Sequence, residues 1–92
     1  MGIIVRGPIV HILASLATVD KTVLKTLGRR VREKRKSLSW SQEELAHRAD
    51  IDRSYIGGVE RGVRNLSFSV LCQICRALEC DVAELTHGIP EL

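Results

Sequence analysis

Apolar residues recur three and four positions apart along most of this 92-residue chain, and no segment from residue 20 onward alternates apolar and polar residues. The first spacing is typical of helices that bury one face, whereas alternation would indicate strands. The length suits one small domain, and the apolar fraction of 45 % excludes general disorder. Aromatic residues make up only 3 % of the chain, so the core must be aliphatic. We therefore predict an all-α domain.

Helix-capping signals divide the chain from residue 20 onward into five helical segments. The polar residues that can cap them are Asp20, Ser41, Asp52, Ser67 and Asp81. The first segment runs to about Lys36. Ser41 is followed three positions later by Glu44, which is the spacing of a capping box. We expect the third segment to end at Gly62 and the fifth near Gly88, because glycine favours the left-handed conformation that ends many helices.

Each of these segments has an apolar side that we expect to face the core. The inward residues are predicted to be Val23, Leu24, Leu27, Val31, Leu45, Ala46, Ala49, Ile56, Val59, Phe68, Leu71, Cys72, Ile74, Cys75 and Leu78. The basic residues of the first segment are expected to lie mostly outward.

Residues 1–19 form a separate apolar segment in front of the domain predicted for residues 20–92. Gly7 and Pro8 can open a helix, and the apolar residues that follow recur on one face. Pro8 and His11 interrupt the run, which is too short to span a membrane. Residues 15–17 imitate a signal-peptidase site, so an export signal is the alternative. We predict an additional N-terminal helix or arm that packs on the domain or on a partner subunit.

Charge and local pattern together point to residues 42–62. Residues 29–66 have a net charge of +4, whereas residues 67–92 have a net charge of −3. A basic middle beside an acidic C-terminal part favours a polyanionic partner, although a solvated helix face is the alternative. Two short helices joined by about four residues have helix-turn-helix geometry. Apolar residues hold the second helix on the first, so its polar side is left free to enter a major groove. Gly57 and Gly58 on that side lower helix stability; close approach to a duplex explains them, and close packing on a neighbouring helix is the alternative.

The sequence of residues 42–49 and 52–65 resembles that of the phage-repressor/Cro (Xre-type) helix-turn-helix family, and the resemblance extends from Leu27 to Leu85. Residues 52–65 look most like the small controller proteins of restriction–modification systems. Two positions depart from the family pattern, because Asp50 stands where glycine is usual and Leu66 where proline is common. The resemblance implies a five-helix repressor-like domain. It also implies a cytoplasmic homodimer that binds double-stranded DNA sequence-specifically and regulates transcription.

The resemblance also assigns the residues that contact DNA. They are Gln42, Arg53, Ser54, Tyr55, Gly57, Gly58, Arg61, Arg64 and Asn65. Gln42 corresponds to a DNA-backbone contact at a helix N-terminus, and Arg53 and Ser54 correspond to base contacts. Tyr55 is expected to contact a phosphate or a thymine methyl, or else to pack partly against the domain. The last three residues of the set resemble phosphate contacts, and a salt bridge is the alternative for Arg61.

The spacing of the cysteines and one histidine raises two alternatives, a metal site and a redox-active site. Cys72, Cys75, Cys80 and His87 have the residue types of a zinc site, but the first two lie on an apolar helical stripe, where free cysteine is commonly buried. The chain has three cysteines, and this odd number favours a reducing compartment. We expect no metal, cofactor, small-molecule ligand or catalysis. The alternative functions are an antitoxin-like protein-interaction module and a cysteine-based redox sensor.

The C-terminal residues and the N-terminal segment are the predicted dimer surface. The candidates are Leu85, Ile89, Leu92 and residues 1–19.

Overall fold

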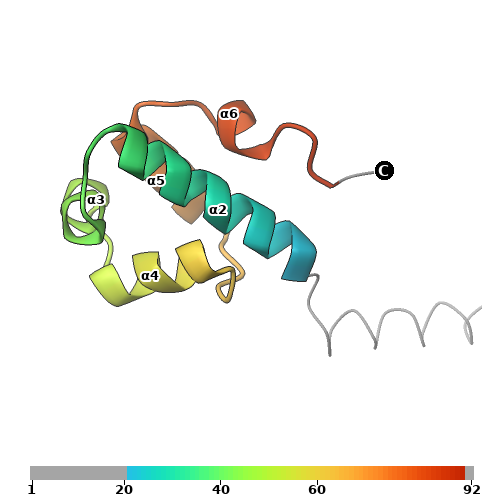
Figure 1. The fold of residues 1–92 in the computed structure, drawn as a ribbon, viewed down its shortest axis with the longest axis horizontal. Coiled ribbons are helices and arrows are strands. Elements are labelled where there is room, and N and C mark those ends of the chain that lie inside the picture. The colour runs from blue at the N-terminus through green and yellow to red at the C-terminus, as the bar shows by residue number, and fades with distance from the viewer. Residues whose placement is uncertain (1–20, 91–92) are drawn as a thin grey trace, which may run out of the picture.

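The computed structural model describes residues 21–90, which form the five α-helices shown in Figure 1. They are α2 (Lys21–Ser37), α3 (Gln42–Ala49), α4 (Arg53–Arg61), α5 (Phe68–Leu78) and α6 (Val82–Thr86). No strand occurs within residues 21–90, so the all-α prediction is confirmed for this part of the chain. The predicted N-terminal helix or arm (1–19), the Asp20 cap and Leu92 lie outside the described residues.

Helix ends form where the sequence predicts them. Four side chains accept a hydrogen bond from a backbone N–H in the first turn of their helix, at distances of 2.9–3.2 Å. They are Ser41, Asp52, Ser67 and Asp81. At the other end of α4, Gly62 adopts the left-handed conformation with φ of 76°. Asp50 does the same after α3, with φ of 57°, so an aspartate supports the turn between α3 and α4 without glycine.

The core is aliphatic and draws on all five helices. Its fully buried large side chains are Leu45, Ile56, Ile74, Leu78, Leu85, Val31 and Val59. Two predictions are wrong here. Phe68 is 68 % exposed, because at the first position of α5 no element within residues 21–90 covers it, even though periodicity places it beside the inward stripe. Leu85 is 2 % exposed within a single chain, so it belongs to this core and cannot form a dimer surface. Cys72 is only half-buried.

Close packing between α2 and α4 depends on Gly28. A Cβ atom at this position would lie 2.3 Å from the Val59 carbonyl oxygen and 2.8 Å from that of Glu60. Such contacts are far too short, so only glycine lets α2 approach the backbone of α4 this closely. The local sequence around Gly28 does not predict this requirement, because it depends on a helix more than 20 positions away.

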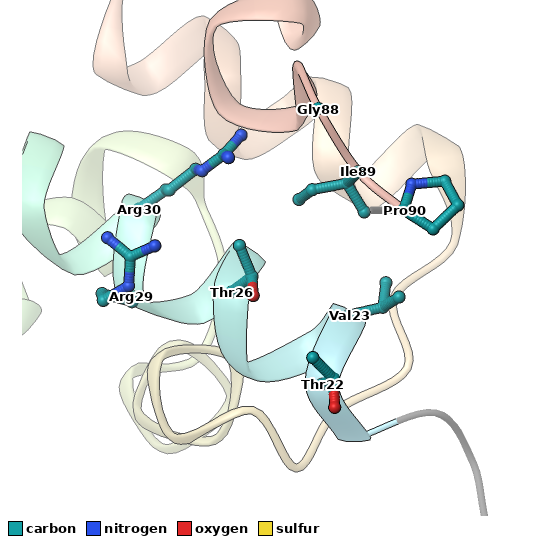
Figure 2. Close-up of a pocket in the computed structure, with 8 residues that line it drawn as sticks. All are labelled: Thr22, Val23, Thr26, Arg29, Arg30, Gly88, Ile89 and Pro90. Carbon is teal, nitrogen blue, oxygen red and sulfur yellow. The ribbon is translucent and has the colours of Figure 1, made fainter. Parts of the chain in front are cut away.

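The C-terminal end of α6 is hydrogen-bonded to α2 through Arg30, which donates to the carbonyl oxygens of Leu85 (3.1 Å) and His87 (2.6 Å). Beside this contact lies a groove with a volume of about 340 Å³. Figure 2 shows its walls, in which the first turns of α2 face Ile89 and Pro90 after α6. Ile89 is only partly covered here.

Candidate nucleic-acid interface

Helix α4 presents two chemically different sides. Ile56 and Val59 are buried against the core, with exposed fractions of 0 % and 2 %. Arg53, Ser54 and Arg61 lie on the exposed side. Helix α3 packs on α4, and the connection of residues 50–52 is short, as a helix-turn-helix requires. The structure therefore brings the polar residues assigned to base recognition together on one accessible helix.

The glycines of α4 do not lie open as predicted. Both are buried, and the atoms nearest to them belong to the long side chains of polar residues. A Cβ at Gly57 would lie 3.2 Å from Arg61 Nη1 and 3.6 Å from Gln42 Oε1, and a Cβ at Gly58 would lie 2.9 Å from Arg64 Cγ. The covering atoms belong to long side chains rather than to the backbone of a neighbouring helix, so close helix packing does not explain the glycines either. Movement of these side chains would expose the α4 backbone.

A buried ion pair forms the base of this surface. Arg35 Nε lies 2.7 Å from Glu60 Oε2, and Arg35 Nη2 lies 2.9 Å from Glu60 Oε1, so the pair is bidentate. The side chains are only 9 % and 3 % exposed. Arg35 Nη1 also donates to the Trp40 carbonyl oxygen at 2.7 Å. Hydrogen bonding to the Glu60 carboxylate raises the pKa of Arg35, so this guanidinium stays charged.

The ion pair continues outward to two of the predicted DNA-contacting residues. Gln42 Nε2 donates to Glu60 Oε1 at 3.1 Å, and Arg53 Nη1 donates to Gln42 Oε1 at 3.2 Å. We call Arg35, Glu60, Gln42 and Arg53 the polar network; it links α2, α3 and α4 and orients Gln42 and Arg53. Sequence reasoning missed Arg35 and Glu60. The available signal for Arg35 is its position four residues after Val31, which continues the inward stripe of α2.

Tyr55 and Ser54 have partners within the domain. Tyr55 is half-buried against the core, and the guanidinium carbon of Arg64 lies 5.0 Å from the centre of its ring, a cation–π distance. The partial packing proposed for Tyr55 is therefore present. The Ser54 hydroxyl donates to the Asp52 carboxylate, which also accepts the Ser54 backbone N–H. These hydrogen bonds lower the pKa of Asp52.

The positions assigned to phosphate contacts are accessible. Arg61, Arg64 and Asn65 are exposed, and within residues 21–90 neither arginine forms an ion pair. The salt bridge considered for Arg61 is thus absent from this part of the chain.

The cysteine alternatives find little support. Residues 21–90 contain no group of three or more His, Cys, Asp or Glu side chains able to hold a metal ion. Burial raises the pKa of the Cys75 thiol to about 12 and also raises that of Cys80. Both thiols therefore resist forming the thiolate that oxidation chemistry needs. Among the helices described here, none is long and apolar enough to cross a membrane.

The chain is similar to proteins that are named as control or controller proteins. The helix-turn-helix family model HTH_3 matches residues 31–85. Control protein C.BamHI of Bacillus amyloliquefaciens is 46 % identical over 52 residues, which is 55 % of this chain and 64 % of that protein, just under two thirds. The crystal structure of the restriction-modification controller protein C.AhdI from Aeromonas hydrophila superposes with a TM-score of 0.66 at 45 % identity, covering 67 % of this chain and 94 % of C.AhdI.

A third relative was solved with DNA. The controller protein C.Esp1396I, as a tetramer in complex with its natural 35 base-pair operator, superposes with a TM-score of 0.65 at 32 % identity, covering 68 % of this chain and 83 % of that one. The family match spans more than half of the chain and includes the polar network from Arg35 to Glu60. The chain therefore belongs to the HTH_3 (Xre-type) helix-turn-helix family, where it is similar to the controller proteins of restriction–modification systems.

Proposed function

We propose that the protein is a sequence-specific, double-stranded-DNA-binding transcriptional regulator that acts as a homodimer and reads operator half-sites through α4. The observation that carries this proposal is the polar network, which fixes Gln42 and Arg53 at the exposed edge of α3 and α4. The operator complex of C.Esp1396I supports it. The role requires binding rather than catalysis, no cofactor, and a cytoplasmic location with the operator DNA.

Roles for individual residues follow from their positions. Arg53 extends from the first turn of α4 and can donate two hydrogen bonds to a guanine edge, with Ser54 beside it. Gln42 is the first residue of α3, where the free backbone N–H groups of the helix favour a phosphate. Arg64 and Asn65 follow α4 and reach phosphates beyond the groove. Tyr55 contributes through its hydroxyl while its ring stays packed.

The two glycines keep α4 thin enough for its backbone to approach the duplex. Arg61 and Arg64 cover Gly57 and Gly58 in the free chain. Both arginines are exposed and have flexible side chains, so they can move from the α4 surface to phosphates when DNA approaches.

Dimerisation supplies the specificity that one small domain lacks. Two copies on half-sites about one helical turn apart double the contacts. Val63 and Phe68 are the large apolar residues that residues 21–90 leave most exposed, at 64 % and 68 %. We propose them, with Ile89, as surface for the second copy, in addition to residues 1–19.

The decisive experiment selects bound sites from random duplexes and then compares variants on the selected site. A palindrome is expected for a dimer. Arg53→Ala should lose discrimination at one base pair of each half-site, about 1–3 kcal/mol. Arg64→Ala should weaken binding to all duplexes alike and reduce the salt slope by about 1. Arg76→Ala is the control, because Arg76 is an exposed arginine on α5, outside the proposed interface. If neither Arg53→Ala nor Arg64→Ala differs from that control, the proposed interface is wrong.

A further inference from the structure

Helix α2 carries eight basic residues and a single acidic one, Glu33. Half of these cations have partners within the domain. Arg29 pairs with Glu33 at 3.2 Å, and Lys34 pairs with Glu84 at 3.0 Å. Arg35 pairs with Glu60, and Arg30 donates to backbone carbonyls. The other four have no ion pair or hydrogen bond to their side chains within residues 21–90: Lys21, Lys25, Arg32 and Lys36.

These four unpaired cations share one side of α2. At about 100° per residue they fall within an arc of about 60°, and at 1.5 Å per residue they extend over about 22 Å. All four are exposed. We call Lys21, Lys25, Arg32 and Lys36 the basic stripe. Of the paired cations, Arg29 lies next to this arc, and its pairing with Glu33 distinguishes it from the stripe.

The stripe borders α4 rather than the far side of the domain. The same helical geometry places Gly28, which contacts the α4 backbone, at the edge of the arc. Lys25 packs beside the end of α4, because a Cβ at Gly62 would lie 2.7 Å from Lys25 Cγ. Figure 1 shows α2 running over α4, with its last turn close to α3.

The stripe therefore lies beside one segment assigned to phosphates and shortly precedes another in the sequence. Lys25 lies next to the start of the loop that carries Arg64 and Asn65. Lys36 lies six positions before Gln42, at the first turn of α3. The stripe connects these two segments along the surface of one helix.

Like charges within the stripe oppose helix formation. Lys21 and Lys25, and likewise Arg32 and Lys36, are four positions apart, where side chains of the same charge repel. Neither pair forms an ion pair with a carboxylate within the described residues, since Glu33 pairs with Arg29 and Glu84 pairs with Lys34. An anion from outside the chain would offset it.

We propose that the basic stripe binds the phosphates of duplex DNA that flank the half-site read by α4. The proposal rests on the proposed function and extends the footprint of each protomer beyond the bases that α4 contacts. Phosphates fit because they form a continuous row of anions, and lysine and arginine on one line can follow such a row without base specificity.

The test compares two double variants that remove the same charge. Arg32→Gln/Lys36→Gln removes two members of the stripe, whereas Lys34→Gln/Arg76→Gln removes one lysine and one arginine outside it. Lys25 is left unchanged because it packs on Gly62. The full chain is titrated by fluorescence anisotropy against the selected site, over a series of NaCl concentrations. One duplex has long flanks, and the other is trimmed to the two half-sites.

On the long duplex, the stripe variant should lower the slope of log Kd against log salt by about 0.9 for each lost phosphate contact, or about 1.8 per protomer. The control variant should leave the slope unchanged, and base discrimination should be the same in both. The difference between the variants should disappear on the trimmed duplex.

Equal slopes for the two variants would overturn the proposal, and this is also the result expected if the stripe binds an acidic protein surface instead. Its failure is distinguishable from that of the proposed function. If the unaltered chain selects a site while both variants behave alike, only the stripe is wrong. If the unaltered chain selects no site, both the proposed function and the proposed role of the stripe are wrong.

Discussion

Replacing Glu60 by alanine removes the carboxylate at the centre of the polar network. This carboxylate accepts hydrogen bonds from Arg35 Nε (2.7 Å), Arg35 Nη2 (2.9 Å) and Gln42 Nε2 (3.1 Å). Glu60→Ala leaves the Arg35 guanidinium charged, nearly buried and without its counter-ion. Breaking a buried pair from one side typically costs about 3–5 kcal/mol. Since small domains are stable by only about 5–15 kcal/mol, the variant should lose a large share of its stability.

Urea denaturation followed by far-UV circular dichroism measures this loss, at a fixed protein concentration because the proposed dimerisation would contribute to stability. Glu33→Ala is the matched control, since it breaks an exposed pair with Arg29 whose side chains are 62 % and 58 % exposed. It should change the free energy of unfolding by about 0.5 kcal/mol or less. If Glu60→Ala stays within about 1 kcal/mol of the unaltered chain, the pair does not have the energetic weight that its burial indicates.

A second variant separates stability from recognition. Arg35→Met/Glu60→Leu removes both charges, so no uncompensated ion remains and much of the lost stability should return. The recovery is incomplete because the Trp40 carbonyl loses its donor, which costs about 1–3 kcal/mol. Gln42 also loses its anchor in this variant, and affinity for the selected duplex should fall even where the domain is folded. Unchanged affinity in the folded double variant would show that the network does not position the interface.

Three further predictions concern other parts of the domain. Gly28→Ala should destabilise the domain by about 1–3 kcal/mol or more, because its Cβ meets α4 backbone. By contrast, Gly57→Ala meets only flexible side chains and should keep or raise the melting temperature while weakening DNA binding; equal melting temperatures for the two variants would contradict this. The folded-state pKa of Asp52 lies below its ordinary value of 3.8, so its stabilisation is present above pH 3.8 and is lost as the pH falls through the folded value. The difference in melting temperature between the unaltered chain and Asp52→Ala should therefore shrink on acidification, and a constant difference would refute the assignment. Because burial raises the pKa of Cys75 to about 12, iodoacetamide at pH 8 should label the half-buried Cys72 well before Cys75, as peptide mass spectrometry would detect; simultaneous labelling would contradict it.

Local signals predict the helices well because each end depends on neighbours in the sequence. Asp52 caps α4 through a residue two positions later, and Gly62 ends it with its own backbone. The misplaced residues depend on distant partners instead. Phe68 lies beside the predicted inward stripe, but whether another element covers the first turn of α5 is a tertiary property. Leu85 likewise joins the core because α6 folds back onto α2 and α5.

The same distinction applies to the candidate interface. Resemblance identifies the polar residues of α4, since they are close together in the sequence, but the ion pair that orients them joins residues 25 positions apart. Charge alone argues for an exposed Arg35, and only the folded chain supplies Glu60 as its partner.

The interface is built on the core rather than added to its surface. Gly28 lets α2 contact the α4 backbone, and this approach allows Arg35 to reach Glu60. Glu60 in turn holds Gln42, which accepts a hydrogen bond from Arg53. The hydrogen bond that orients Arg53 therefore depends on contacts between helices, so we expect a change that shifts α2 against α4 to alter the proposed DNA recognition. It follows that substitutions between α2 and α4 should affect the choice of DNA sequence even where no substituted atom touches DNA.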